Sequence, residues 1–564
     1  MRRLSQPFLW FSVSLFAFYM VLVLARPQGV FWSLDEGGKL LYIQNVLQRA
    51  SATAPLIYPG RTLDPSLEYL PLFFYARQGS EIYSWWPVGF PLLTLPFYRL
   101  LGWAGLYVLP ALAGAAASAL SALIAVRLAP ALFASNRTRQ VVLLMTAALV
   151  GLATPMLFYS TMFWEHTLSV ALLLLGLWLA LRSGQDNCGW CAIAAGAAVG
   201  FAGFLRTEQL FAGLGILAVL TLWRWRHGVR MGVSLAVLTA AWMAFNYAMM
   251  GSWISRQWGA NTSELTNALF PGLTEAGLLY IPYLLFNAPK IIAYDLGTPL
   301  LVLGTLLVAA CLILPAVRRL WPLLAACYAG LAAVCAVVLF QPEGYRSVHG
   351  VVLIAPQIVC FAWLYYMLRR KDVARWPVAM LSAAALVVLL AFVARSWLAA
   401  GGQQWGSRYL LVLYPLLTIA AVVGLFPLAH SPRGGAVRFL LAAAAVLVLI
   451  GAGFQVRGQQ AVWTTVQNYR LTQAALEKTD LTPKLTDCIW LPMVIPELYW
   501  RGDFYARTNG QDPAAWQASI RSLGAAAGEW LDMDMCMPEP LDQVQRLRQA
   551  NPTGVDLRSI DGTQ

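Results

Sequence analysis

Charged residues are scarce in this chain of 564 residues. Asp, Glu, Lys and Arg together make up 12% of the sequence, and histidine occurs only 4 times. Ordinary soluble domains carry about twice that share of charge, so this composition excludes a soluble globular protein over most of the chain. Hydrophobic residues reach 59% and the mean hydropathy is +0.62, which predicts an α-helical polytopic membrane protein.

Cysteine is also sparse, because 8 scattered residues do not make a disulfide framework. Cys188 and Cys191 form a C-x-x-C motif without a second pair, for which we expect neither a zinc site nor redox chemistry. Cys488 and Cys536 differ because they lie in a soluble-like C-terminal region. We predict that these two cysteines form a disulfide.

Acidic residues are the scarcer charge, with 26 Asp and Glu against 39 Lys and Arg. A net charge of +13 can indicate a nucleic-acid partner. Here, however, the bases form short runs between apolar segments, where orientation signals lie. We therefore expect the membrane as a partner and no nucleic acid.

The first apolar run, residues 8–25, follows Arg2 and Arg3 and is long enough to cross a bilayer. A cleaved signal peptide is the rival interpretation, but so much later hydrophobic sequence needs no separate export signal. We therefore expect a cytoplasmic N-terminus and about 13 spans in total. The later spans are expected at residues 104–126, 140–160, 167–181, 192–205, 210–223, 231–250, 295–314, 321–340, 349–368, 376–397, 410–428 and 439–455.

Residues 86–101 are apolar but contain three prolines, so we expect a broken or re-entrant helix there and not a span. With this choice, the loops assigned to the cytoplasm are rich in arginine and hold only the acids Asp186 and Asp372. That division follows the positive-inside rule. It predicts a bacterial-type inner (plasma) membrane protein whose C-terminus is extracytoplasmic.

Three regions follow from this topology. Residues 1–456 form the membrane domain, in which residues 26–103 are the first extracytoplasmic loop. Within that loop we expect an amphipathic helix on the membrane surface at 36–48 and a small hairpin between 69 and 85. Residues 457–564 have a soluble-like composition and are expected to fold as a small α/β domain. Its expected helices are 461–478, 514–523 and 541–550, and its expected strands are 487–491, 530–533 and 554–557.

Two adjacent carboxylates, Asp35 and Glu36, lie in the loop that follows the first apolar run. Acids this close to a bilayer are costly, so they indicate a functional site or a well-solvated position. The alternative is that both merely complement the dipole at the start of the next helix.

Five short motifs carry a family resemblance through their order and their expected side of the membrane. They are FWSLDEGGK (31–39), YSWWPVGFP (83–91), FWEH (163–166), FLRTE (204–208) and GSRYL (406–410). Together they resemble the GT-C membrane glycosyltransferases, the superfamily of protein O-mannosyltransferases and the lipid A aminoarabinose transferase. The resemblance implies a GT-C-like fold and transfer of a sugar from a polyprenyl-phosphate-linked donor to a lipid, glycan or protein acceptor.

The resemblance also implies roles for the acidic residues. Asp35 is the expected catalytic base, Glu36 orders the loop or the acceptor, and Glu165 with His166 marks the second acidic position. A helix-end pair satisfied within the protein is the alternative for Glu165 and His166.

Several cations are expected near the extracytoplasmic ends of spans, where positive charge does not help orientation. A guanidinium group binds phosphate oxygens through two hydrogen bonds, so we assign these residues to the donor phosphate. The assigned set is Arg206, Lys290, Arg346, Arg408 and Tyr409. The alternatives are ion pairs of Arg206 with Glu208 and of Arg346 with Glu343, and a membrane-surface position for Arg408.

No His/Cys cluster demands a metal, so we expect a reaction without a cofactor, although a divalent ion is compatible with the sequence. We expect inversion at the anomeric carbon by direct displacement. A transporter or flippase of lipid-linked sugars is the alternative class, and it typically has internal repeats and charges near mid-bilayer. No repeat is evident and the charges gather at one surface, which favours the enzyme.

Overall fold

The computed structural model describes most of the chain, and its helices and strands divide into two compact units. Unit 1 comprises Met1–Val23, Tyr107–Phe245 and Asn261–Gln459, and unit 2 comprises Leu24–Leu106, Asn246–Ala260 and Gln460–Gln564. The described residues are 6–72, 75–253, 284–286, 297–340, 348–367, 373–394, 404–429, 435–477, 483–486, 488–506, 527–532 and 556–561.

Within these ranges, eight helices are long and apolar enough to cross a membrane, by length and composition. Three further apolar helices are shorter: α8 (Gly189–Leu205), α9 (Gln209–Trp223) and α19 (Leu413–Ala429). The protein is therefore an α-helical, polytopic integral membrane protein, as its composition predicts. The expected total of about 13 spans stays a prediction.

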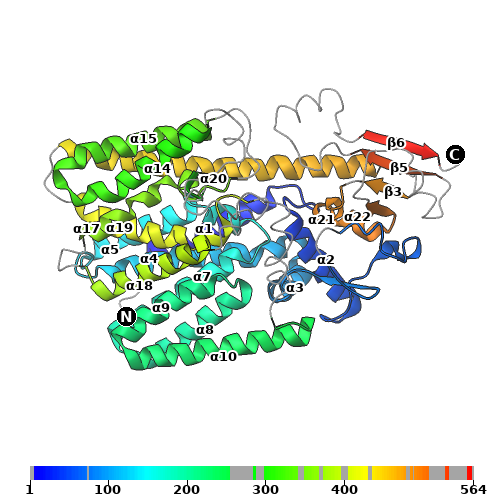
Figure 1. Ribbon diagram of the computed structural model, residues 1–564, viewed down its shortest axis with the longest axis horizontal. Helices are drawn as coiled ribbons and strands as arrows, with labels where there is room; N and C mark the ends of the chain where they lie inside the picture. The colour runs from blue at the N-terminus through cyan, green and yellow to red at the C-terminus, as the bar shows by residue number, and fades with distance from the viewer. Residues whose placement is uncertain are drawn as a thin grey trace. The chain divides into compact units, whose positions relative to one another are not determined.

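Unit 1 is a set of packed helices. α7 (His166–Asp186) packs against α8 and α9, and α18 (Arg375–Ala394) packs on α9 (Figure 1). A second group pairs α14 (Gly297–Ile313) with α15 (Trp321–Leu339). The remaining long helices assigned wholly or partly to this unit are α1 (Gln6–Leu24), α4 (Gly105–Leu128), α10 (Trp225–Met250) and α20 (Gly435–Leu476).

Proline divides two of the expected spans. The expected span at 140–160 is α5 (Asn136–Leu152) followed by α6 (Met156–Ser160). Pro155 has no N–H for the carbonyl of Gly151, and the Tyr19 hydroxyl donates to that carbonyl instead, at 2.8 Å. The break is thus satisfied inside the protein.

The expected span at 349–368 is divided in the same way, at Pro356. It consists of α16 (Val351–Ile354), the 3₁₀ helix η7 (Pro356–Phe361) and α17 (Ala362–Met367). α19 packs against η7, α17 and α5, so the broken segment still belongs to the helical core of unit 1.

Residues 86–101, expected as a broken helix, contain α3 (Gly89–Leu101). Pro91 falls in the first turn, where a missing N–H is tolerated, and Pro96 lies inside the helix. α3 ends at Gly102, whose φ of +58° suits glycine. The stretch Gly89–Leu128 is apolar and long enough to cross a membrane. A re-entrant course for residues 86–101 therefore stays a prediction.

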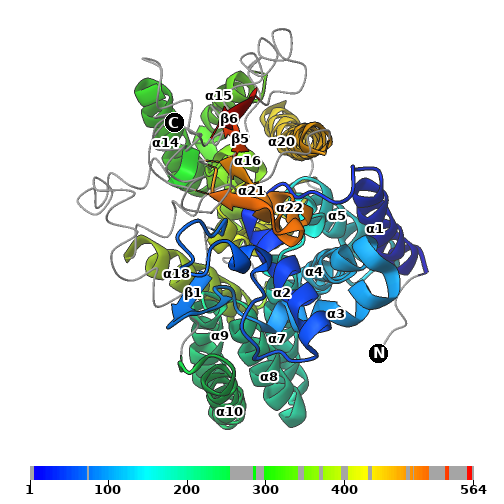
Figure 2. The same cartoon turned by 90° about the vertical axis from the view of Figure 1, so that its right-hand side faces the viewer.

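Unit 2 contains both the first loop and the C-terminal tail. From the loop come α2 (Leu34–Arg49), the 3₁₀ helix η1 (Pro59–Thr62) and the expected hairpin, β1 (Tyr75–Gln78) antiparallel to β2 (Glu81–Ser84). From the tail come α21 (Leu491–Val494) and α22 (Pro496–Arg501), which pack against α2 (Figure 2).

The packing of α2 differs from the expected helix on the membrane surface. Leu40, Leu41 and Ile43 are buried, and α2 contacts α3, α21 and α22. The buried part of its apolar face is covered by protein because the tail supplies a partner for it, whereas Leu47 near the end of the helix is 39% exposed. Hydrophobic periodicity within one segment cannot reveal such a partner.

The tail also forms a four-stranded sheet in the order β4-β3-β5-β6. β3 (Lys484–Thr486) is parallel to β4 (Phe504–Ala506) and β5 (Ala527–Asp532), and β6 (Asp556–Asp561) is antiparallel to β5. The strand expected at 487–491 is wrong in position, because β3 precedes it and α21 begins at Leu491. The helices expected at 514–523 and 541–550 lie outside the described residues.

Cys188 and Cys191 are joined in a disulfide, which uses both thiols that a zinc site would need. The expectation that this motif carries no redox chemistry stays a prediction, because a bond between the two cysteines does not show that they exchange electrons. Cys488 is buried, whereas Cys536 lies outside the described residues, so their pairing stays a prediction.

Candidate active site

In unit 1, three helix ends position the charged residues that the motifs single out. Glu165 immediately precedes α7 and His166 begins it, and both side chains are buried. Arg206 follows the last residue of α8, and Glu208 precedes the first residue of α9. Backbone groups at helix ends lack intrahelical partners, so polar side chains are readily accommodated there.

Arg206 joins the two acids. Its Nη1 lies 3.2 Å from Glu165 Oε1, and its Nε lies 2.7 Å from Glu208 Oε1. Burial lowers the pKa of Arg206, but the charges of Glu208 and Glu165 outweigh it, and the net effect raises that pKa. The pairing of Arg206 with Glu208 is therefore confirmed, and Glu165 shares the same cation. The clearest role of Arg206 is to hold Glu165.

Arg408 is placed by a tight backbone turn. Gly406 has a φ of +70°, and a Cβ there would lie 2.6 Å from the Tyr414 hydroxyl, so only glycine fits. Trp405 pairs with Val348 in an isolated β-bridge, and the Gln404 side chain accepts a hydrogen bond from the backbone N–H of Arg408 at 3.1 Å. The backbone turn of the GSRYL motif thus fixes the position from which the Arg408 side chain extends.

Aromatic rings surround the two arginines. The guanidinium carbons of Arg206 and Arg408 lie 5.0 and 5.2 Å from the centre of the Tyr409 ring, and Arg408 lies 5.5 Å from the Trp164 ring. Arg408 Nη2 also donates to the Tyr409 hydroxyl at 3.5 Å. Such cation–π contacts stabilise guanidinium groups that have lost water.

A third aromatic residue connects these groups to the backbone. The Tyr159 ring stacks on His166 with centres 5.4 Å apart, and its hydroxyl donates to the carbonyl of Gly406 at 3.1 Å. We define the arginine–aromatic cluster by its members: Tyr159, Trp164, Glu165, His166, Arg206, Arg408 and Tyr409. It brings together five residues that the sequence predicts for the site.

Tyr159 was not predicted from the sequence, because it lies in no motif, and Trp164 was given no role. The nearby Pro155 is the signal that could have drawn attention to Tyr159, because a proline within an expected span exposes backbone groups that need side-chain partners. Lys290 and Arg346 lie outside the described residues.

Unit 2 holds the other two predicted acids, in different environments. Glu36 is buried, and its Oε2 accepts hydrogen bonds from the Ser33 N–H at 3.2 Å and from the Ser33 hydroxyl at 3.4 Å. This is a capping box that begins α2. Asp35 is half-buried, and the indole N–H of Trp86 donates to its Oδ1 at 3.3 Å. Glu36 therefore caps the N-terminus of α2, whereas the carboxylate of Asp35 is suited to act on a bound molecule.

One turn beyond Asp35, Lys39 is 2% exposed, and its Nζ lies 5.7 Å from the centre of the Phe90 ring. The sequence placed Lys39 in a motif without assigning it a role. In the part of the chain that the structure describes, no group of three or more His, Cys, Asp or Glu residues could hold a metal ion. A reaction without a metal stays a prediction.

No family model and no curated protein matches the chain. The solved structures that are similar include ArnT from Cupriavidus metallidurans bound to undecaprenyl phosphate, with a TM-score of 0.48, and the same enzyme in the apo state, with a TM-score of 0.46. Each is 14% identical, and each match covers 96% of this chain and 94% of the other. At this identity the likeness concerns the fold alone.

Proposed function

We propose that the protein is a membrane glycosyltransferase that moves a sugar from a polyprenyl-phosphate-linked donor to an acceptor. The observation that carries this proposal is the arginine–aromatic cluster, in which two buried guanidinium groups share the ring of Tyr409 beside the buried carboxylate of Glu165. Removing ions from water costs several kcal/mol each, so apolar helical proteins keep them mainly where they act on a ligand.

In this proposal Arg408 and Tyr409 hold the donor phosphate. A guanidinium with five N–H donors binds phosphate oxygens in pairs, and the aromatic rings beside Arg408 keep its plane fixed. Arg206 is already shared between Glu165 and Glu208, so its part in this proposal is to position Glu165. Lys290 and Arg346 are further candidates for the phosphate.

The reaction we propose is a direct displacement. Asp35 removes a proton from the acceptor, and the acceptor atom then forms a bond to the anomeric carbon as the bond from that carbon to the phosphate oxygen breaks. The bonding electrons leave with the polyprenyl phosphate, whose charge Arg408 stabilises. The configuration at the anomeric carbon inverts, and no redox partner or cofactor is consumed. The acceptor is a lipid, a glycan or a protein, on the extracytoplasmic face of a bacterial-type inner membrane.

The experiment that tests this function measures what becomes of the donor. Purified protein in vesicles is given polyprenyl-phosphate sugars together with a membrane extract as the source of acceptor, and free polyprenyl phosphate is quantified by mass spectrometry. Release that depends on the protein and on the acceptor supports transfer. Movement of intact donor between leaflets without release contradicts it and supports a flippase.

A further inference from the structure

Two adjacent glycines, Gly37 and Gly38, follow the acids in α2, although glycine is among the least favourable residues in a helix. Both are tightly covered within unit 2. A Cβ on Gly37 would overlap the backbone carbonyl of Met493, and a Cβ on Gly38 would overlap the ring of Trp86. The helix therefore has no side chain at the two positions where a tail segment and an indole ring rest on it.

Trp86, whose ring fills the space beside Gly38, also donates a hydrogen bond to Asp35. Trp86 is 3% exposed, and its indole N–H reaches Asp35 Oδ1 at 3.3 Å. A general base must present its carboxylate in a fixed direction, because misplacement by about 1 Å can cost about 100-fold in rate. A ring that rests on the backbone of α2 holds its N–H in a fixed place relative to Asp35, which belongs to the same helix.

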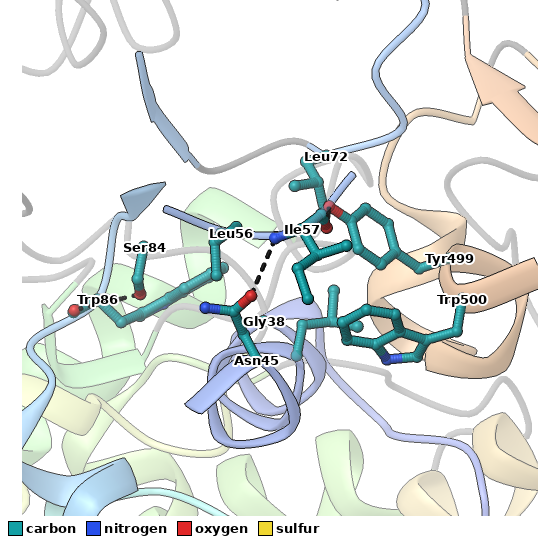
Figure 3. A pocket seen from close by; sticks show the side chains of 10 residues that line it. Gly38, Asn45, Leu56, Ile57, Leu72, Ser84, Trp86, Tyr499 and Trp500 are labelled. Carbon is teal, nitrogen blue, oxygen red and sulfur yellow. Dashed lines mark hydrogen bonds between the residues drawn. The ribbon is translucent and has the colours of Figure 1, made fainter. Parts of the chain in front are cut away.

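A small cavity borders the same ring. Figure 3 shows Trp86 and Gly38 among its lining residues, with Tyr499 and Trp500 of the tail on the far side. Tyr499 donates to the carbonyl of Ile57 at 2.7 Å, and Trp500 Nε1 donates to Gln44 Oε1 at 2.6 Å. These bonds fasten the tail to the first loop and to α2.

We infer that Trp86 is a positioning residue for Asp35, which orients the carboxylate through its indole N–H, and that Gly38 is required so that the ring can lie on α2. The inference rests on the proposed function, in which Asp35 is the base. It adds a role that the motifs do not assign and makes the packing against Gly38 a condition for catalysis.

The experiment is a double-mutant cycle on sugar transfer by the full-length protein. Trp86→Phe keeps an aromatic ring beside Gly38 and removes the N–H. We expect kcat to fall about 10-fold with the donor KM unchanged, as for loss of a hydrogen bond to a charged group. In the Asp35→Asn background the same change should cost no further activity, because Trp86 acts through Asp35. Gly38→Ala should behave likewise.

Trp500→Phe is the matched control, since it removes an indole N–H that borders the same cavity but bonds to Gln44. Its effect should multiply with that of Asp35→Asn. If Trp86→Phe fails to fold, 3-benzothienylalanine at position 86 keeps the indole shape without the N–H and gives the same reading. If the losses of activity from Trp86→Phe and Asp35→Asn multiply in the double variant, the inference about Trp86 is overturned and the proposed function still stands. If Asp35→Asn transfers sugar at a near-normal rate, Asp35 is not the base, and the inference about Trp86 is overturned with that assignment.

Discussion

Arg206 forms ion pairs with two carboxylates at the arginine–aromatic cluster. Its side chain is 8% exposed and lies between Glu165, at 6%, and Glu208, at 16%. A charge triad of this kind depends on all its members, because each loses water on burial. The same contacts that fix Glu165 make the cluster sensitive to loss of the cation.

Arg206→Met should therefore destabilise the protein strongly. Breaking a buried ion pair by removing one partner typically costs about 3–5 kcal/mol, since the remaining carboxylates are left uncompensated. Arg61→Met is the matched control, because Arg61 pairs with Glu81 at 38% and 39% exposure and such a pair contributes about 0–1 kcal/mol. Thermal unfolding in detergent gives the comparison, and equal melting temperatures for the two variants would contradict it.

Residue roles were predictable where local sequence contains the information. The pattern Ser33-x-x-Glu36 is a capping-box signature, so the helical role of Glu36 is readable from sequence. The partners of Asp35 and Arg408 are not, because Trp86 lies 51 positions from Asp35 and Trp164 is far from Arg408 in sequence. Such contacts arise only from tertiary packing.

The GSRYL turn and the two proline breaks are the elements that shape the site in unit 1. Gly406 packs against Pro155, the residue that divides α5 from α6, and its carbonyl accepts from Tyr159, which lies within α6. A change in this turn would displace the backbone on which Arg408 is carried.

Gly406→Ala should lower stability by about 1–3 kcal/mol, as expected for a non-glycine residue held at a positive φ. In the proposed function it should also weaken binding of the polyprenyl-phosphate donor, since Arg408 lies two residues further on. Gly435→Ala is the control, because a Cβ there meets open space at the start of α20. Unfolding curves and lipid binding are measured on both variants, and a Gly406→Ala protein as stable as the Gly435→Ala protein would refute this reading of the turn.

At the element scale, long apolar helices were predictable from hydropathy, but the breaks at Pro155 and Pro356 were not predicted, because both segments were expected as continuous spans. α21, α22 and β4 were missed because segments of 3–6 residues are too short to show a period. α20 joins the expected span at 439–455 to the expected helix at 461–478, since a change from apolar to polar composition does not end a helix.

For the whole molecule, the main departure from expectation is that the first loop and the tail fold into one compact unit. The backbone N–H of Phe31 donates to the carbonyl of Val494 at 2.8 Å, and the N–H of Ala506 donates to Tyr69 at 2.9 Å. Backbone pairing between distant segments has no signature in sequence. The segment that carries Asp35 is therefore stabilised by the tail, which motifs in the loop alone do not suggest.

The orientation predicted from loop charges places both the first loop and the tail outside the cytoplasm. A C-terminal fusion to a reporter that is active only in the cytoplasm should therefore show no activity, and a fusion at the N-terminus should be active. Strong activity from the C-terminal fusion would show that the C-terminus is cytoplasmic, and it would contradict the extracytoplasmic location assigned to the active site.

The predicted extracytoplasmic location of the tail favours a disulfide between its two cysteines. Cys488 is fully buried near β3, and we expect it to be linked to Cys536. Peptide mapping without reduction should recover the linked peptides. Recovery of both cysteines as thiols from protein isolated under oxidising conditions would rule the bond out.

In the proposed reaction the base and the phosphate site have different tasks, and one paired assay tests this most directly. Sugar transfer and polyprenyl phosphate binding are measured on the same purified Asp35→Asn and Arg408→Ala proteins. Asp35→Asn should lower transfer by about 10²- to 10⁴-fold and leave lipid binding intact, because only the proton acceptor is lost. Arg408→Ala should weaken both, since its bond to phosphate exists before and during reaction. Near-normal transfer by Asp35→Asn would contradict the account and make Glu165 the next carboxylate to test.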